Sequence, residues 1–243
     1  MNGQSIVHAF AALILAAGLA AGGWLVGEGF RQSRIAERYV TVKGTSERTV
    51  KADLALWPIR FVATGNDLAQ VQAKLVKDGA AIKALLSSAG LTDKDIELQR
   101  LDVTDLLAQA YRSGPVDSRF IVAQTLMARS TDVDQIAAAG QRLSQLVDAG
   151  IVLSSDFGPG GPVYLFTKLN DIKPQMIAEA TRNAREAAEQ FAKDSGARIG
   201  GIRRANQGLF EILPRDRAPQ LTEETQIEKT VRVVSTVDYL LAD

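Results

Sequence analysis

Aspartates are the side chains in this sequence whose spacing could do chemistry. Three close pairs occur: Asp93 with Asp95, Asp102 with Asp105, and Asp132 with Asp134. Such a pair could hold a calcium ion or act as an acid and a base, although none has the glycine and terminal glutamate of an EF-hand loop. Helix capping and solvation at strand ends explain the same pairs, and we expect these structural roles. Carboxylate-based catalysis stays open as an alternative.

Side chains for other kinds of catalysis are scarce. The chain has no cysteine, and its one histidine, His8, lies in the apolar N-terminal segment. Disulfides, thiolate nucleophiles and cysteine zinc sites are therefore excluded, and no serine beyond that segment has an imidazole partner. We expect His8 to reach a membrane interface instead of forming a proton or metal site. We expect a protein that is not an enzyme and that needs no cofactor and no metal.

The stretch "DFGPGGP" (156–162) contains the Asp-Phe-Gly triplet of protein kinases and a run of glycines. A kinase also needs a His-Arg-Asp loop, and a phosphate-binding loop needs Gly-Lys-Ser/Thr before a helix. Neither context is present, so the stretch is predicted to be a plain loop.

Two arginine groups are candidate contacts for an anionic partner or for lipid head groups: Arg203 with Arg204, and Arg215 with Arg217. No stacking aromatic residues accompany them, and 28 basic residues balance 28 acidic ones. Nucleic acid is therefore not expected as a partner. Solvation at strand ends is the plainer explanation of both groups.

The segment from residue 6 to residue 26 has no charged side chain. As a helix it would be about 31 Å long, close to the roughly 30 Å hydrocarbon core of a bilayer. We interpret it as a retained membrane anchor; a cleaved signal and a buried soluble helix are the alternatives. The expected anchor residues are Ile6, Phe10, Leu13, Leu15, Leu19, Trp24 and Val26.

The orientation of this anchor is ambiguous. Arg31, Arg34 and Arg38 follow the apolar segment, and no Lys or Arg precedes it. The positive-inside rule would keep the main domain in the cytoplasm, but long domains can be translocated largely regardless of charge.

Alternating residues predict strands at 39–50 and 52–63, with Pro58 at an edge position or a bulge. A helix follows between Asn66, its expected N-cap, and Gly90. Two further strands are expected around a turn at 113–115, with a bulge between Leu98 and Leu101.

A second helix is predicted from Thr131, its expected cap, to Gly150, with a buried stripe of Val133, Ile136, Gly140, Leu143 and Val147. A strand and a third helix follow, with Pro174 in its first turn and Gly196 at its end. Its inner face is expected to contain Ala180, Ala184, Ala187, Ala188 and Ala192 with Met176 and Phe191. Two final strands are separated by a polar loop at 214–225, so the fold class is α+β with largely antiparallel sheets and packed helices.

Three stretches resemble the SIMPL-domain family, also called domain of unknown function 541, which includes bacterial periplasmic proteins such as the Brucella 26 kDa antigen. They are "YVTVKG" followed by "VKADLALW", "EATRNAREAAEQFAKDSGARIGGI", and "VRVVSTVDYLL". Ala52 stands where the family has a proline. The resemblance covers residues 39–241.

The resemblance implies a SIMPL-like domain at 39–243. The residues before it are interpreted as an anchor at 1–27 and a polar juxtamembrane linker at 28–38. Together with the anchor, the resemblance implies an envelope protein in the bacterial inner membrane, with one span and the domain in the periplasm, that acts by homo-oligomeric assembly or by binding a partner. Some family members are linked to oxidative-stress tolerance. No catalytic residues carry over from the family. A periplasmic module that binds a small ligand or lipid is the alternative function, and the protein partner or ligand itself is not indicated.

Overall fold

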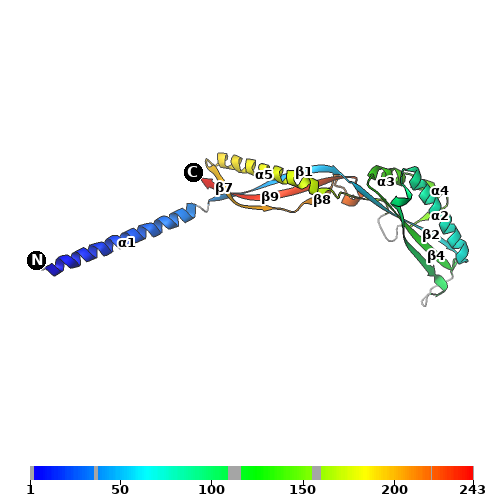
Figure 1. Ribbon diagram of the computed structural model, residues 1–243, viewed down its shortest axis with the longest axis horizontal. Coiled ribbons are helices and arrows are strands. Elements are labelled where there is room, and N and C mark those ends of the chain that lie inside the picture. The colour runs from blue at the N-terminus through cyan, green and yellow to red at the C-terminus, as the bar shows by residue number, and fades with distance from the viewer. Residues whose placement is uncertain (1–2, 36–37, 109–115, 155–159, 220, 243) are drawn as a thin grey trace. The chain divides into compact units, whose positions relative to one another are not determined.

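The computed structural model describes residues 3–35, 38–108, 116–154, 160–219 and 221–242. They form the helices and antiparallel strands of an α+β fold, which confirms the predicted class (Figure 1). The elements are α1 (Gly3–Ile35), β1 (Tyr39–Lys51), β2 (Leu54–Gly65), α2 (Leu68–Ser88), β3 (Ile96–Asp105), β4 (Phe120–Ser130), α3 (Val133–Gly140), α4 (Leu143–Asp148), β5 (Val152–Leu153), β6 (Val163–Leu165), α5 (Leu169–Asp194), β7 (Arg198–Gln207), β8 (Glu211–Pro214) and β9 (Glu228–Ala242), with short 3-10 turns at η1 (Asp93–Asp95), η2 (Leu106–Ala108) and η3 (Glu223–Thr225).

The chain folds as two compact units. Unit one contains Met1–Ser46, Pro174–Phe210 and Val233–Asp243, and unit two contains Glu47–Lys173 and Glu211–Arg232. Both units take residues from the stretch 39–243.

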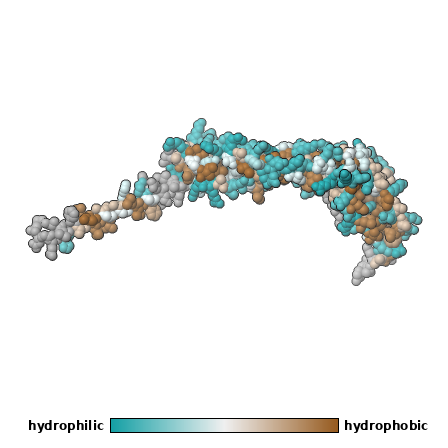
Figure 2. All heavy atoms as spheres, in the orientation of Figure 1, coloured by the Kyte–Doolittle hydropathy of each residue, from teal (hydrophilic) through white to brown (hydrophobic). Residues whose placement is uncertain are grey.

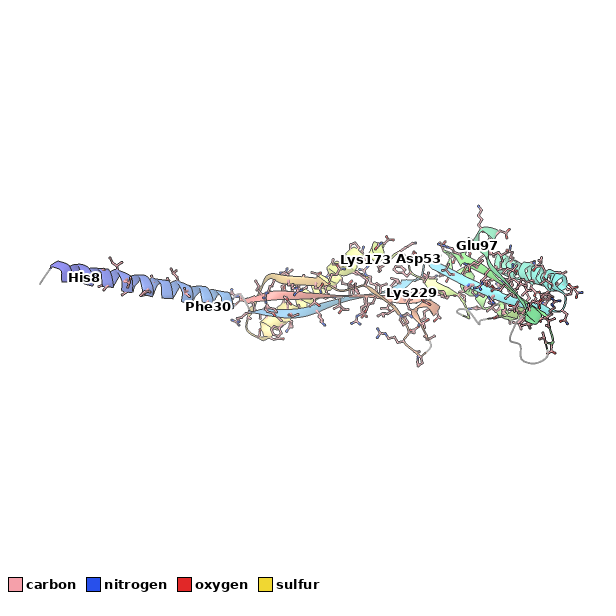
Figure 3. All side chains as sticks on the ribbon, turned by 90° about the horizontal axis from the view of Figure 1, so that it is seen from below. His8, Phe30, Asp53, Glu97, Lys173 and Lys229 are labelled. Atoms are coloured by element: carbon pink, nitrogen blue, oxygen red, sulfur yellow. The ribbon has the colours of Figure 1, made fainter. Side chains whose placement is uncertain are left out.

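Helix α1 is one continuous helix of 33 residues. It includes most of the stretch that was expected to be a polar linker, because it ends only at Ile35. His8 and Phe30 lie toward its two ends (Figure 3).

The sheet of unit one has the strand order β1-β9-β7, and α5 packs on it through small residues. The buried residues of α5 are Met176, Ala180, Ala184, Ala188 and Ala192. This spacing of four keeps one narrow face of the helix against the sheet. The prediction was wrong for Ala187, which is exposed, and for Phe191, which is 49% exposed, because both lie outside that face.

Helix α5 begins earlier than its sequence suggests. Pro174 is its sixth residue, not part of its first turn, because the helix starts at Leu169. Gly196 ends it as predicted, with φ +69°, a backbone conformation that favours glycine.

The sheet of unit two has the strand order β3-β4-β2-β5, with β6 also paired to β2. Its core lies between this sheet and the helices α2 and α3. The largest fully buried apolar side chains of this core are Phe61, Leu75, Ile82, Leu86, Val122 and Ile136. The bulge predicted in β3 is confirmed, since the register with β4 shifts between Leu98 and Arg100. The turn expected at 113–115 lies outside the described residues.

Pro58 lies inside β2, opposite Met127 of β4. On the other side of β2, β6 pairs with residues 54–56 and β5 pairs with residues 61 and 62. Among the described residues, Pro58 thus falls in the gap between these two short strands. A residue without an N–H is tolerated at such a local edge.

Two predicted helix caps were wrong by one residue. Asp67, not Asn66, caps α2, and its carboxylate accepts the N–H groups of Ala69 and Gln70. Asp132, not Thr131, caps α3 by accepting the N–H of Asp134.

The second predicted helix is broken in two, because α3 ends at Gly140 and α4 starts at Leu143. Glycine is a poor helix former, and a break there costs little. Val147, expected in the buried stripe, is exposed as a result.

Candidate functional site

The N-terminal segment is helical and apolar in the structure, as its sequence predicts. The stretch Ala11–Phe30 is long and apolar enough to cross a membrane, and none of it is buried against the rest of the described chain. Figure 2 shows brown, apolar residues along this helix. A signal sequence near an N-terminus has the same properties. The helix is therefore a candidate membrane anchor or a candidate signal sequence.

The expected anchor residues all fall within α1, and five of them have described, exposed side chains. The exposed ones are Leu13, Leu15, Leu19, Trp24 and Val26. The side chains of Ile6 and Phe10 lie outside the described part of the structure. A row of large exposed apolar side chains is unfavourable in water and favourable in lipid.

The first arginine group lies on β7, in unit one. The guanidinium carbon of Arg203 is 4.2 Å from the centroid of the Tyr39 ring, which is cation–π distance. Arg204 is exposed, next to Asp238 of β9 in the strand register. The Arg203 side chain is therefore held at the sheet surface.

The second arginine group lies in the loop after β8, in unit two. Arg215 pairs with its neighbour Asp216 at 2.9 Å, and this hydrogen bond raises the pKa of Arg215. Arg217 is exposed. Because Asp216 neutralises Arg215, this group presents less net charge than its sequence indicates.

Two of the aspartate pairs take part in helix capping, as predicted. Asp95 accepts the N–H of Thr92 at 2.8 Å and its hydroxyl at 2.7 Å, and these bonds lower the pKa of Asp95. Asp132 caps α3, and its neighbour Asp134 carries the N–H that it accepts. Asp93, the partner of Asp95, is exposed.

The other carboxylates of these pairs form ion pairs, which their spacing did not indicate. Asp102 accepts hydrogen bonds from Arg60 at 3.0 Å and from Arg100 at 2.7 Å. Asp105 accepts one from Arg119 at 2.8 Å, and Asp134 accepts one from Lys51 at 2.5 Å. Within the described part of the chain, no three metal-binding side chains come together. The "DFGPGGP" loop lies mostly outside the described residues.

A buried ion pair in unit two was not predicted. Lys229 on β9 is 0% exposed, and its ammonium group lies 2.5 Å from a carboxylate oxygen of Glu223 (Figure 3 labels Lys229). It also donates to the backbone carbonyl of Glu223 at 2.5 Å. The sequence does contain a signal for the burial of Lys229, because Lys229, Val231 and Val233 alternate along β9 and so face the same, buried side of the strand.

A second unpredicted contact joins Asp53, just before β2, to Thr167, just before α5. The carboxylate of Asp53 accepts the N–H of Thr167 at 2.6 Å and its hydroxyl at 2.8 Å. Burial pushes the pKa of Asp53 upward, but these hydrogen bonds outweigh it and lower the pKa. The preceding residue, Ala52, donates its N–H to the carbonyl of Ile227 at 2.8 Å, a bond that a proline could not make.

Two of the hollows among the described residues bear on ligand binding. In unit two, Trp57, Arg60, Leu143 and Ser154 help to line a space of about 170 Å³. In unit one, a space of about 390 Å³ lies beside α5. Ligand pockets have volumes of roughly 300–1,000 Å³, so the hollow beside α5 has the size of a small-molecule site and the hollow in unit two does not.

A comparison with protein families gives a match over most of the chain. The family model described as SIMPL, a protein of unknown function (DUF541), matches residues 40–239. No curated protein matches the chain.

Proposed function

This chain belongs to the SIMPL family, whose function is unknown, and from this premise we propose that it is a non-catalytic cell-envelope protein, anchored in the bacterial inner membrane by α1. The observation that carries the proposal is the apolar stretch Ala11–Phe30. Its exposed leucines and Trp24 need an apolar environment, and a bilayer supplies one along the whole length of the stretch.

The domain after the anchor is proposed to lie in the periplasm. The family resemblance supports this side of the membrane. Arg31, Arg34 and Arg38 favour the cytoplasm, but charge has less influence on the translocation of long domains. The absence of cysteine is compatible with an oxidising compartment.

The domain is proposed to act by forming homo-oligomers or by binding a protein partner, in a process connected with stress tolerance. A formal net charge of zero does little to oppose self-association. Strand β7 lies at one edge of its sheet, and its residue Ile202 is exposed. An edge strand of this kind can pair with another chain. Leu209, just after β7, is 88% exposed and adds apolar surface.

The assembly is tested by the mass of the full chain, purified in a non-ionic detergent and measured by light scattering on a sizing column. We expect one discrete species whose protein mass is a multiple of the chain mass. The double variant Leu209→Ser with Ile202→Ser should shift the population toward the single chain. The matched control is Leu221→Ser, because Leu221 is also exposed but lies in unit two. A single-chain mass for the unaltered protein at every concentration would contradict self-assembly.

A further inference from the structure

The hollow in unit one lies between the flank of α5 and the first part of β7. Its volume is about 390 Å³. It is lined by Ala178, Thr181, Arg182 and Arg185 of α5, by Ile199, Gly200, Gly201 and Ile202 of β7, and by Tyr239 of β9. Because the α5 residues are spaced three and four apart, they form one side of the helix, next to its buried alanine face.

The local irregularity of β7 makes this space. The register between β7 and β9 shifts between Ile199 and Ile202 and again between Ile202 and Arg204. Gly200 and Gly201 fall in the first of these shifts. A Cβ on Gly201 would meet no atom within 4 Å, so the strand leaves open space at this position. Bulges in edge strands commonly re-aim side chains or end pairing near binding sites.

The charge of the hollow is positive. Arg185 donates to Glu189 at 2.8 Å, so its charge is partly balanced. The Arg182 side chain makes no hydrogen bond or ion pair with the part of the chain that the structure describes. No acidic side chain is among the lining residues. A guanidinium group offers several N–H donors in a plane, which suits the oxygens of a carboxylate or phosphate.

The remaining lining is largely apolar. Ile202 is 54% exposed, so it keeps a large apolar surface beside the arginines. The Tyr239 ring and the side chains of Ile199 and Ala178 complete the wall. A site with a few charged donors and an apolar wall suits a ligand that has an anionic group at one end and an apolar body.

We propose that this hollow binds a small amphiphilic anion, with its carboxylate or phosphate at Arg182 and its apolar body against Ile202 and Tyr239. The site is distinct from the membrane anchor, and it shares Ile202 with the edge of β7 that is proposed above for self-assembly. It is also distinct from the arginine groups of the sequence prediction, since neither Arg203 nor Arg204 lines it.

The proposal is tested by isothermal titration calorimetry with the full chain in lipid nanodiscs. Hexanoate and hexyl phosphate are the probes, because they are too short to partition strongly into lipid. We expect at least one of them to bind once per chain. Hexanol lacks the anion and inorganic phosphate lacks the apolar body, and each should bind about tenfold or more weakly. Failure of both anionic probes to bind the unaltered protein would overturn the proposal.

Substitutions locate the binding. Arg182→Ala should weaken binding about tenfold or more, whereas Arg182→Lys should retain part of it. Gly201→Leu should block binding by filling the hollow without removing a charge. Arg217→Ala removes one arginine from unit two and should leave the affinity unchanged. Equal binding by Arg182→Ala, Gly201→Leu and the unaltered protein would place the ligand elsewhere and overturn the assignment.

Discussion

Gly44 of β1 lies directly against Ala184 of α5. A Cβ built on Gly44 would stand 2.8 Å from the Ala184 Cβ, 2.4 Å from the Ala184 N and 1.9 Å from the carbonyl oxygen of Ala180. The strand and the helix therefore touch through their backbones. Only glycine fits on the strand, and a small side chain is needed on the helix.

Replacing Gly44 with alanine should destabilise unit one strongly. Overpacking typically costs 1–3 kcal/mol, and here the obstructing atoms belong to the helix backbone, so we expect roughly 3 kcal/mol or more. Gly201→Ala is the matched control, because its Cβ would meet nothing within 4 Å. Urea unfolding of the full chain in detergent, followed by circular dichroism, measures both. Equal midpoints for the two variants would contradict this packing.

The ion pair between Glu223 and Lys229 should contribute to stability. Glu223→Ala leaves the buried Lys229 ammonium without its carboxylate, and breaking such a pair costs about 3–5 kcal/mol. Adding Lys229→Met should recover much of this loss, because the charge that needed the partner is then gone. Glu224→Ala, at the exposed neighbouring position, is the control. If the single Glu223→Ala variant unfolds at the same urea concentration as the control, Lys229 does not depend on Glu223.

Because of Asp53, the stability of the folded protein should depend on pH. Its pKa is lower in the folded protein than the ordinary value of 3.8. The folded state therefore gains stability from the ionised carboxylate at pH values above 3.8, and this gain is lost as the pH falls below 3.8 through the lowered pKa. We expect Asp53→Asn to be less stable at pH 7 and to lose less further stability on acidification.

Thr167→Val tests the same contact from the other side. It removes the hydroxyl donor to Asp53 and keeps the N–H donor, so its acid sensitivity should lie between those of the unaltered protein and Asp53→Asn. The free energy of unfolding, measured at pH 3, 4, 5 and 7, checks both variants. Parallel curves for all three proteins would show that the contact contributes nothing to the pH dependence.

The sequence predicted the fold class because alternation and helical spacing are local properties that burial enforces. It predicted the caps less well, because Asn66 and Asp67 are adjacent residues with similar capping ability. What separates them is a distant contact, since the Asn66 side chain accepts the N–H of Arg119. The break after Gly140 and the early start of α5 before Pro174 likewise go against the usual helix signals, which are only a weak guide to helix ends.

The candidate sites were predictable to different degrees. The anchor is a continuous stretch, and its composition is enough to identify it. The hollow beside α5 needs Arg182 of a helix and Gly201 of a bulged strand in one place, which composition does not encode. The pair Gly200 and Gly201 was the one available signal, because adjacent glycines in a strand indicate a bulge or open space.

The position of the domain relative to the membrane is the most direct test of the proposed function. The chain has no cysteine, so Ser87→Cys, at an exposed position of α2, gives one unambiguous label site. Gln4→Cys places the label before the apolar stretch instead.

We expect a membrane-impermeant maleimide to label the Ser87→Cys variant in intact spheroplasts, and the Gln4→Cys variant only after lysis. Both proteins should remain in the membrane pellet after carbonate extraction. The reverse labelling pattern, or release of the Ser87→Cys variant as a shortened soluble protein, would contradict a periplasmic domain held by a retained anchor.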